Sequence, residues 1–201
     1  MVRHMSNRYA EVARKTAETD IKIELRLDGT GESTVSTGIG FFDHMLKTWA
    51  KHASFDLVVT CQGDLAVDGH HTVEDVGICL GRALRQCLAG GAGIARYGSS
   101  FIPMDEALIH VVVDICGRGY LASDLRFPQE FIGQLESCLV VEFLLAFAHN
   151  AGVCLHVRQL AGHNSHHIAE AVFKALAHAL RQAVTITDSH DLLSTKGQLD
   201  L

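Results

Sequence analysis

The 201-residue sequence has no long apolar run and only two prolines. Its most apolar segment, residues 138–148, is shorter than the roughly 20 residues that a membrane-spanning helix needs, and it contains Glu142. No apolar stretch follows the basic residues near the N-terminus, so we expect no signal peptide. The net charge of −6 argues against a nucleic-acid-binding surface. We therefore expect neither a membrane partner nor a nucleic-acid partner.

Paired cysteines are also lacking. None of the six cysteines belongs to a Cys-x-x-Cys pair, and several lie in apolar segments, where a free thiol packs as a small hydrophobic group. We expect reduced cysteines in a cytoplasmic protein rather than a disulfide framework. With 48% hydrophobic and 20% charged residues, the composition is that of a folded chain with a core. Histidine is plentiful, with 13 residues that include two adjacent pairs.

Two segments of the chain repeat each other. When the sequence is shifted by 96 residues, the His-His-x-x-Glu motif at 70–74 falls on the one at 166–170. With no gap, the Ala-Leu-Arg-Gln at 83–86 then falls on the same four residues at 179–182. Two amphipathic helices often share alanine and leucine, but they do not often share His-His-x-x-Glu at the same offset. The sequence therefore predicts an internal duplication.

Hydrophobic periodicity gives the two halves the same order of elements. Strands are predicted at 20–27, 33–37, 55–61, 107–115 and 153–160, and helices around 42–49 and at 71–88, 135–151 and 166–184. We expect an α+β protein made of two repeats, residues 1–92 and 93–201, each a sheet with two helices. Because each repeat alone would have a thin core, the two are expected to pack together as one compact body.

The repeated motif carries the residue types of a metal site. On a helix, Glu74 shares a face with His70 or with His71, whereas adjacent histidines point about 100° apart. Each motif therefore suits two metal ions, and the two motifs together supply four imidazoles and two carboxylates. Imidazole and carboxylate without thiolate suit Mn, Fe, Co, Ni or Zn, and six-coordination with open positions favours Mn or Fe.

The division of these ligands between two ions is left open by the spacing. One symmetric division places His70, His167 and Glu170 at one ion, and His71, His166 and Glu74 at the other. Two familiar alternatives do not fit. Di-iron bundles use Glu-x-x-His on long helices without strands, and zincins need a glutamate directly after the first histidine.

Further motifs extend along nearly the whole chain. They are Gly-Phe-Phe-Asp-His-Met-Leu at 40–46, Asp-Gly-His-His-Thr-Val-Glu-Asp at 68–75, Pro-Met-Asp-Glu-Ala at 103–107, Gly-Arg-Gly-Tyr at 117–120, Leu-His-Val-Arg at 155–158, Asn-Ser-His-His-Ile-Ala-Glu-Ala at 164–171 and Ser-Thr-Lys-Gly at 194–197. In order and spacing they resemble the imidazoleglycerol-phosphate dehydratase family of histidine biosynthesis. The resemblance implies internally duplicated units like domain 2 of ribosomal protein S5, two Mn²⁺ ions per active site, and a 24-subunit homo-oligomer with active sites between subunits.

The resemblance also implies roles for individual residues. The implied metal ligands are His44, His70, His71, Glu74, Glu142, His166, His167 and Glu170, where Glu142 occupies a position that is histidine in some members. The implied catalytic residues are Glu18, His70 and Glu170. The implied contacts to the phosphate and ring of the substrate come from Glu18, Arg96, Arg118, Lys174, Ser194 and Lys196. Asp75 and Asp105 are candidates for orienting the ligands.

The implied reaction is the Mn-dependent elimination of water from D-erythro-imidazole glycerol phosphate, a small-molecule phosphate, to give imidazole acetol phosphate. The proton to be lost lies on a carbon without an adjacent carbonyl, so no enolate forms, whereas an imidazolate ring can expel the hydroxyl. Two cations would hold that ring as an anion. A carboxylate such as Glu18 would move the proton, and arginine suits the phosphate.

Two other classes of function fit the sequence less well. A metal-storage or assembly protein would keep the metal ligands but would need neither Glu18 nor the arginines and lysines of the phosphate set. A metal-dependent hydrolase would need a water aimed at an ester or amide, and the sequence has no separate oxyanion-hole motif.

Overall fold

The structure is a computed structural model, which describes residues 8–189, 191–197, 199 and 201. The first half contains β1 (Tyr9–Lys15), β2 (Thr19–Arg26), β3 (Ser33–Ser36), α1 (Gly40–Ala53), β4 (Asp56–Gly63) and α2 (His70–Leu88). The second half contains β5 (Tyr97–Met104), β6 (Ala107–Ile115), β7 (Tyr120–Ser123), β8 (Phe131–Ile132), β9 (Leu135–Glu136), α3 (Leu139–Ala151), β10 (Val153–Ala161) and α4 (Ser165–Ala183).

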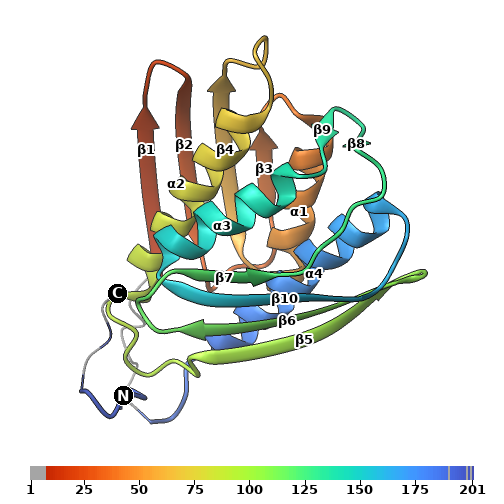
Figure 1. The fold of residues 1–201 in the computed structure, drawn as a ribbon. Coiled ribbons are helices and arrows are strands. Elements are labelled where there is room, and N and C mark those ends of the chain that lie inside the picture. Colours follow the sequence, from red (N-terminus) through yellow and green to blue (C-terminus); the bar gives the residue numbers. More distant parts are fainter. Residues whose placement is uncertain (1–7, 190, 198, 200) are drawn as a thin grey trace.

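The two halves form sheets of the same topology. The first sheet has the order β1-β2-β4-β3 and the second the order β5-β6-β10-β7. In each sheet the last strand pairs in parallel with its neighbour, and the other pairs are antiparallel. The four long helices lie between the two sheets (Figure 1). This matching of elements confirms the predicted α+β fold with two similar sheet-and-helix units. Residues 92 and 93 remain our proposed boundary between them.

Both sheets bury one face against the helices. The side chains of β6 alternate strictly between buried and half-buried, as expected for a strand with one face on the core. Helix α2 packs against β1 and β2, and α4 packs against β5 and β6. Across the middle, α2 contacts α3 and α1 contacts α4, so the helices of one half pack on those of the other. None of the helices in the described part of the chain is long and apolar enough to span a membrane.

Aromatic side chains fill the space between the two halves. Phe42 and Trp49 of α1 lie edge-on to Phe143 and Phe147 of α3, with ring centroids 5.5 and 6.4 Å apart. Phe143 also stacks on Phe173 of α4 at 5.2 Å. All five rings are essentially inaccessible to solvent and belong to one continuous core. Burial of such rings contributes most to the cohesion of the two halves.

The predicted helix at 135–151 needs correction. It begins only at Leu139, because Leu135 and Glu136 form β9 in a short hairpin with β8. Strands β1, β5 and β7 and this hairpin were not predicted. Strands β1, β5 and β7 are edge strands, where the sequence pattern is commonly less regular than in a central strand.

The starts of helices α1, α2, α3 and α4 meet at one end of the molecule. Gly69, just before α2, lies so close to the starts of α1 and α3 that an added Cβ would be 3.2 Å from Ile39 and 3.3 Å from Leu139. The ring of Phe41 at the start of α1 lies 5.0 Å from that of His166 at the start of α4. The fold therefore brings both His-His-x-x-Glu motifs to this end.

Candidate active site

Each His-His pair is fixed in the first turn of its helix by a preceding side chain. The carboxylate of Asp68 accepts a hydrogen bond from the backbone N–H of His70 at 2.8 Å. In the second half, the amide oxygen of Asn164 accepts one from the N–H of His166 at 2.9 Å. Asp and Asn are preferred at helix starts because their oxygens satisfy free backbone N–H groups. The duplication therefore includes the caps as well as the histidines.

The first cluster lies at the start of α2. His70 Nε2 is 3.8 Å from Glu74 Oε2, four residues along the same helix face. His71 contacts two carboxylates, with its Nδ1 3.0 Å from Asp64 Oδ2 and its Nε2 3.7 Å from Glu18 Oε1. The hydrogen bond to Asp64 raises the pKa of His71 above its ordinary value.

The second cluster, at the start of α4, has the same arrangement. His166 Nε2 is 3.2 Å from Glu170 Oε2, and His167 Nδ1 is 2.6 Å from Glu106 Oε2. The other ring nitrogen of His167 is 3.6 Å from Asp105 Oδ2. The bond from His167 lowers the pKa of Glu106 to about 2, and the same bond raises the pKa of His167.

Glu170 is the most enclosed carboxylate of the second cluster, with 9% of its surface exposed. His44 of α1 reaches it, with Nε2 3.8 Å from Oε2. Lys174, one turn further along α4, forms an ion pair with its other oxygen at 2.7 Å. Burial acts to raise the pKa of Glu170, but the bonds from Lys174 and His166 outweigh it and the pKa lies below its ordinary value. Glu170 is thus held as a carboxylate beside two imidazoles.

Seven of the eight expected metal ligands lie in the two clusters of one chain, with His44 in the second. The eighth, Glu142, lies in the first turn of α3 and is not among the residues that these contacts join. No hydrogen bond or ion pair joins the first cluster to the second among the described residues, and in that part of the chain no three His, Cys, Asp or Glu side chains are arranged to hold an ion. The donor types fit a divalent ion such as Mn²⁺. The symmetric division of the ligands between two ions, in which each ion is bound by residues of both motifs, remains a hypothesis.

The predicted phosphate contacts lie elsewhere. Arg96 forms an ion pair with Asp114, with Nε 2.7 Å from Oδ1, and donates to the carbonyl of Leu193, next to Ser194. Its backbone N–H donates to the carbonyl of Ala183, the last residue of α4. Lys196 follows Ser194 in the same segment, and Arg118 lies in the turn between β6 and β7.

Because α4 has 19 residues, its two ends are separated by roughly 25 Å at about 1.5 Å per residue. The histidine cluster lies at the start of α4 and Arg96 at its end. One chain therefore does not bring Arg96 to its own second cluster. Lys174 is the exception in the phosphate set, since it lies beside Glu170.

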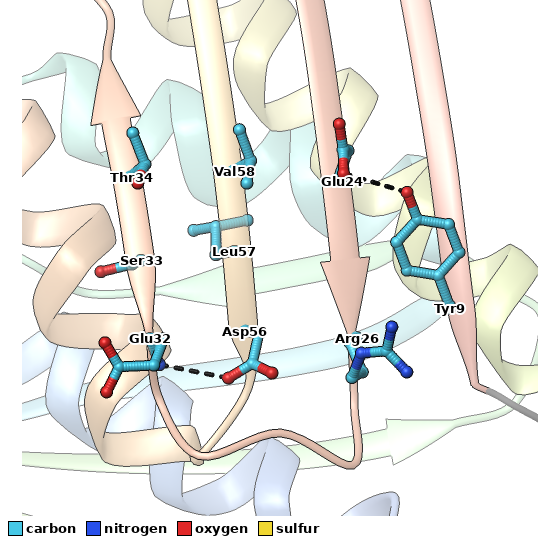
Figure 2. A pocket seen from close by; sticks show the side chains of 9 residues that line it. All are labelled: Tyr9, Glu24, Arg26, Glu32, Ser33, Thr34, Asp56, Leu57 and Val58. Carbon is cyan, nitrogen blue, oxygen red and sulfur yellow. Dashed lines mark hydrogen bonds between the residues drawn. The ribbon is translucent and has the colours of Figure 1, made fainter.

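Two surface pockets differ in their position relative to the predicted site. A shallow pocket of about 250 Å³ lies on the outer face of the first sheet and contains no histidine (Figure 2). Within it, Tyr9 donates to Glu24 at 3.0 Å, and Asp56 accepts from the backbone N–H of Glu32 at 3.1 Å. A pocket of about 460 Å³ adjoins the second cluster and is lined in part by Glu106, His166 and His167. Only the second pocket touches the predicted site.

Two residues of the clusters were not predicted from the sequence, and the role predicted for a third, Asp75, is wrong. Asp64 and Glu106 contact the histidines directly but were not predicted, although Glu106 follows the predicted Asp105 in the Pro-Met-Asp-Glu motif. Asp75 does not orient a histidine. It is buried and accepts from Thr19 Oγ1 at 2.6 Å and from Arg14, which ties α2 to β1 and β2.

Comparisons with known proteins agree with one another. Residues 37–180 match the family model of imidazoleglycerol-phosphate dehydratase. The proteins of that name from Moorella thermoacetica and Acetivibrio thermocellus are each 54% identical over 194 residues, which cover 96% of this chain and 99% or 100% of theirs. The crystal structure of the Staphylococcus aureus enzyme superposes with a TM-score of 0.81 at 37% identity, covering 89% of this chain and 99% of that one. The Pyrococcus furiosus structure also gives 0.81 and 37%, covering 94% and 100%.

The duplicated fold and these relatives define an enzyme of the hydro-lyase class, which eliminates water from its substrate. The particular family follows from the extent of the match. The chain belongs to the imidazoleglycerol-phosphate dehydratase family.

Proposed function

We propose that this chain catalyses the Mn²⁺-dependent elimination of water from D-erythro-imidazole glycerol phosphate, giving imidazole acetol phosphate in histidine biosynthesis. The observation that carries the proposal is the pair of imidazole–carboxylate clusters at the starts of α2 and α4, in a chain of this family. A site of two matching halves suits a substrate whose ring presents two nitrogen atoms.

The ions would be held by the imidazoles and carboxylates of the two clusters. The proposed ligands are His44, His70, His71, Glu74, Glu142, His166, His167 and Glu170. Two bound Mn²⁺ ions would act as Lewis acids that favour the anionic form of the substrate ring. The chain's own contribution is to present these donors on rigid helix starts.

Glu18 is the proposed proton-transfer group, with His70 and Glu170 as the other proposed catalytic residues. Its backbone is held in the β1–β2 turn, where its N–H donates to Thr16 Oγ1 at 3.1 Å. Its side chain is 52% exposed and points toward His71, so it can reach a substrate bound beside that ring. A carboxylate on a fixed backbone with a free side chain suits general acid–base work.

The phosphate would be bound by four cationic side chains and one hydroxyl, those of Arg96, Arg118, Lys174, Lys196 and Ser194. Arg96 is oriented by Asp114 and by the carbonyl of Leu193, which brings it next to Ser194. Asp114 accepts from Nε and Nη2 of Arg96 and the carbonyl of Leu193 accepts from Nη1, so a phosphate would bind to the remaining N–H groups of this oriented guanidinium. Because Arg96 lies at the far end of α4 from His166, the phosphate and ring contacts of one site would come from different chains.

Active sites between subunits require an oligomer, and we propose a homo-oligomer of 24 subunits. The outer face of the second sheet supports this, because it exposes the large aromatic and aliphatic side chains of Tyr97, Phe101, Tyr120 and Leu160. The outer face of the first sheet instead carries the ion pairs of Glu11, Lys22 and Glu24. Large exposed apolar groups on one face indicate an interaction surface. The six free cysteines fit the proposed cytoplasmic location.

The direct test is an assay of imidazole acetol phosphate formation. Protein stripped with EDTA should have no dehydratase activity, and added Mn²⁺ should restore it. Formation of the product at an equal rate without any divalent ion would overturn the metal dependence. No product under either condition would overturn the dehydratase proposal itself.

A further inference from the structure

The second histidine of each pair has a carboxylate on its Nδ1. His71 Nδ1 lies 3.0 Å from Asp64 Oδ2, and His167 Nδ1 lies 2.6 Å from Glu106 Oε2. The carboxylates are only 28% and 27% exposed, and the imidazoles 32% and 25%. Both contacts are therefore partly shielded from water, where a charged hydrogen bond is stronger than on an open surface.

These two contacts arise from different parts of the fold. Asp64 directly follows β4, whereas Glu106 lies in the turn between β5 and β6. At the 96-residue shift that aligns the histidines, Asp64 falls on Leu160, which has no carboxylate. The duplication alone therefore does not explain why both rings are held in the same way. A common function of the two imidazoles does explain this similarity.

The hydrogen bonds at Nδ1 indicate what this common function is. A carboxylate accepts a hydrogen bond only from a nitrogen that carries a proton, so a neutral ring held at Nδ1 has its lone pair on Nε2. In both clusters Nε2 is directed to the remaining acidic groups, 3.7 Å from Glu18 in the first and 3.6 Å from Asp105 in the second. Histidines that bind metals usually have their other nitrogen held in this way.

We propose that Asp64 and Glu106 are positioning residues that hold His71 and His167 through Nδ1 and so present Nε2 of each ring to a metal ion. The inference rests on the metal dependence proposed above. Glu106 also accepts from the backbone N–H groups of His163 and Asn164, at 3.1 and 2.8 Å, so it fixes the loop that leads into α4 together with the ring. Among the described residues, the carboxylate of Asp64 contacts only the ring of His71, so it acts on the ring alone.

The test compares Asp64→Asn and Glu106→Gln with wild type in two measurements. The first is Mn²⁺ affinity of the EDTA-stripped assembly, measured by titration with the ion alone. Each variant should bind Mn²⁺ about 10–100-fold more weakly, which is the usual effect of removing such a partner. Glu11→Gln, which removes one exposed carboxylate of the first sheet, is the matched control and should bind like wild type.

The second measurement is the protonation pattern of the rings without metal, by solid-state ¹⁵N NMR of histidine-labelled protein at alkaline pH, where the rings are neutral. Wild type should show His71 and His167 with the proton on Nδ1, and each variant should lose that preference at its own histidine. A purely structural role would change thermal stability but not this pattern. Since Glu106→Gln also removes loop bonds, Asp64→Asn keeps the proposal testable if the former variant does not fold.

The outcomes separate the two proposals. If wild type fails to bind Mn²⁺, the proposed function is overturned, whatever the NMR pattern. If wild type binds Mn²⁺ and folded variants bind it equally well with unchanged ring protonation, the positioning role is wrong and the proposed function stands.

Discussion

At the scale of single residues, the two clusters distribute acidic groups in the same way. The first histidine of each pair faces the glutamate of its own helix, and the second has an acidic group near each ring nitrogen. Glu18 and Asp105 are alike in being at least half exposed, and each lies beyond hydrogen-bond distance of Nε2 of the second histidine, at 3.7 and 3.6 Å. The resemblance to the family selects Glu18 from these two as the acid proposed to act on the substrate.

Replacement of Glu18 by Gln should leave Mn²⁺ content unchanged and lower kcat by about 10²-fold or more, the usual contribution of a general acid or base. Steady-state kinetics together with metal analysis of the same sample check this. Glu11→Gln is the control for loss of one exposed acid. Turnover at the wild-type rate would remove Glu18 from the mechanism.

Asp28 gives a pH-dependent prediction. Arg8 donates to it, with Nε 2.8 Å from Oδ2, and the bond holds the pKa of Asp28 below its ordinary 3.8. A lowered folded-state pKa stabilises the protein above the ordinary pKa, and this stabilisation is lost as the pH falls below it.

Asp28→Asn should therefore lower the free energy of unfolding at pH 7 by at most about 1 kcal/mol, since the carboxylate is 37% exposed. The difference from wild type should shrink as the pH falls from 5 toward 3. Urea unfolding at several pH values measures it, with Asp20→Asn, an exposed acid of the same sheet, as control. A difference that grows toward low pH would contradict this assignment.

At the scale of elements, the packing of α2 on α3 depends on small residues. A Cβ added to Gly81 would lie 2.7 Å from the backbone oxygen of Phe147 and 2.9 Å from the backbone nitrogen of Ala151, so the helices must separate to admit it. Gly40, at the start of α1, has no atom within 4 Å of an added Cβ. Gly77, one turn earlier on α2, also faces α3, since an added Cβ there would lie 2.9 Å from the backbone oxygen of Phe143, so both glycines allow the close contact of the two helices.

Gly81→Ala should lower the melting temperature, because overpacking of this kind costs about 1–3 kcal/mol and outweighs the helix propensity that alanine adds. Gly40→Ala is the matched control and should change it little. Differential scanning calorimetry checks both. An unchanged or raised melting temperature for Gly81→Ala would contradict this prediction, because it would show that α2 and α3 can move apart without loss of stability.

The elements also show what the sequence can and cannot reveal. Strand β6 and helices α2 and α4 were predicted almost to the residue, because their buried positions recur regularly and the repeated motif fixes the helix starts. The histidines and Glu170 were predicted from that motif. Asp105 was a candidate for orienting a ligand, but its neighbour Glu106 was missed, although Glu106 makes the shorter contact with His167. Which of two adjacent acids reaches the ring depends on the pairing of β6 with β10 and the packing of α4, which the sequence alone does not show.

At the scale of the whole molecule, one chain separates the groups that one substrate would need. The second histidine cluster and Arg96 lie at opposite ends of α4. If chains assemble so that Arg96 of one meets a histidine cluster of another, sites become complete only in the oligomer.

Arg96→Ala and His167→Ala should each abolish most activity alone, whereas mixed assemblies of the two variants, obtained by co-expression with two different tags, should regain a measurable fraction. In a mixed assembly some sites combine an intact arginine from one chain with an intact histidine from another. The control is a mixture of the two variant assemblies that were purified separately and have not exchanged subunits. Mixed assemblies as inactive as their parents would show that each site lies within one chain.

The central claim is that two matching clusters of imidazole and carboxylate bind a pair of ions, and metal analysis of the assembled protein tests it most directly. After equilibration with Mn²⁺ and removal of free ion, inductively coupled plasma mass spectrometry should find about two Mn²⁺ per chain. The doubly substituted Glu74→Gln, Glu170→Gln protein should hold far less. Folded wild-type protein that retains no manganese would contradict the account.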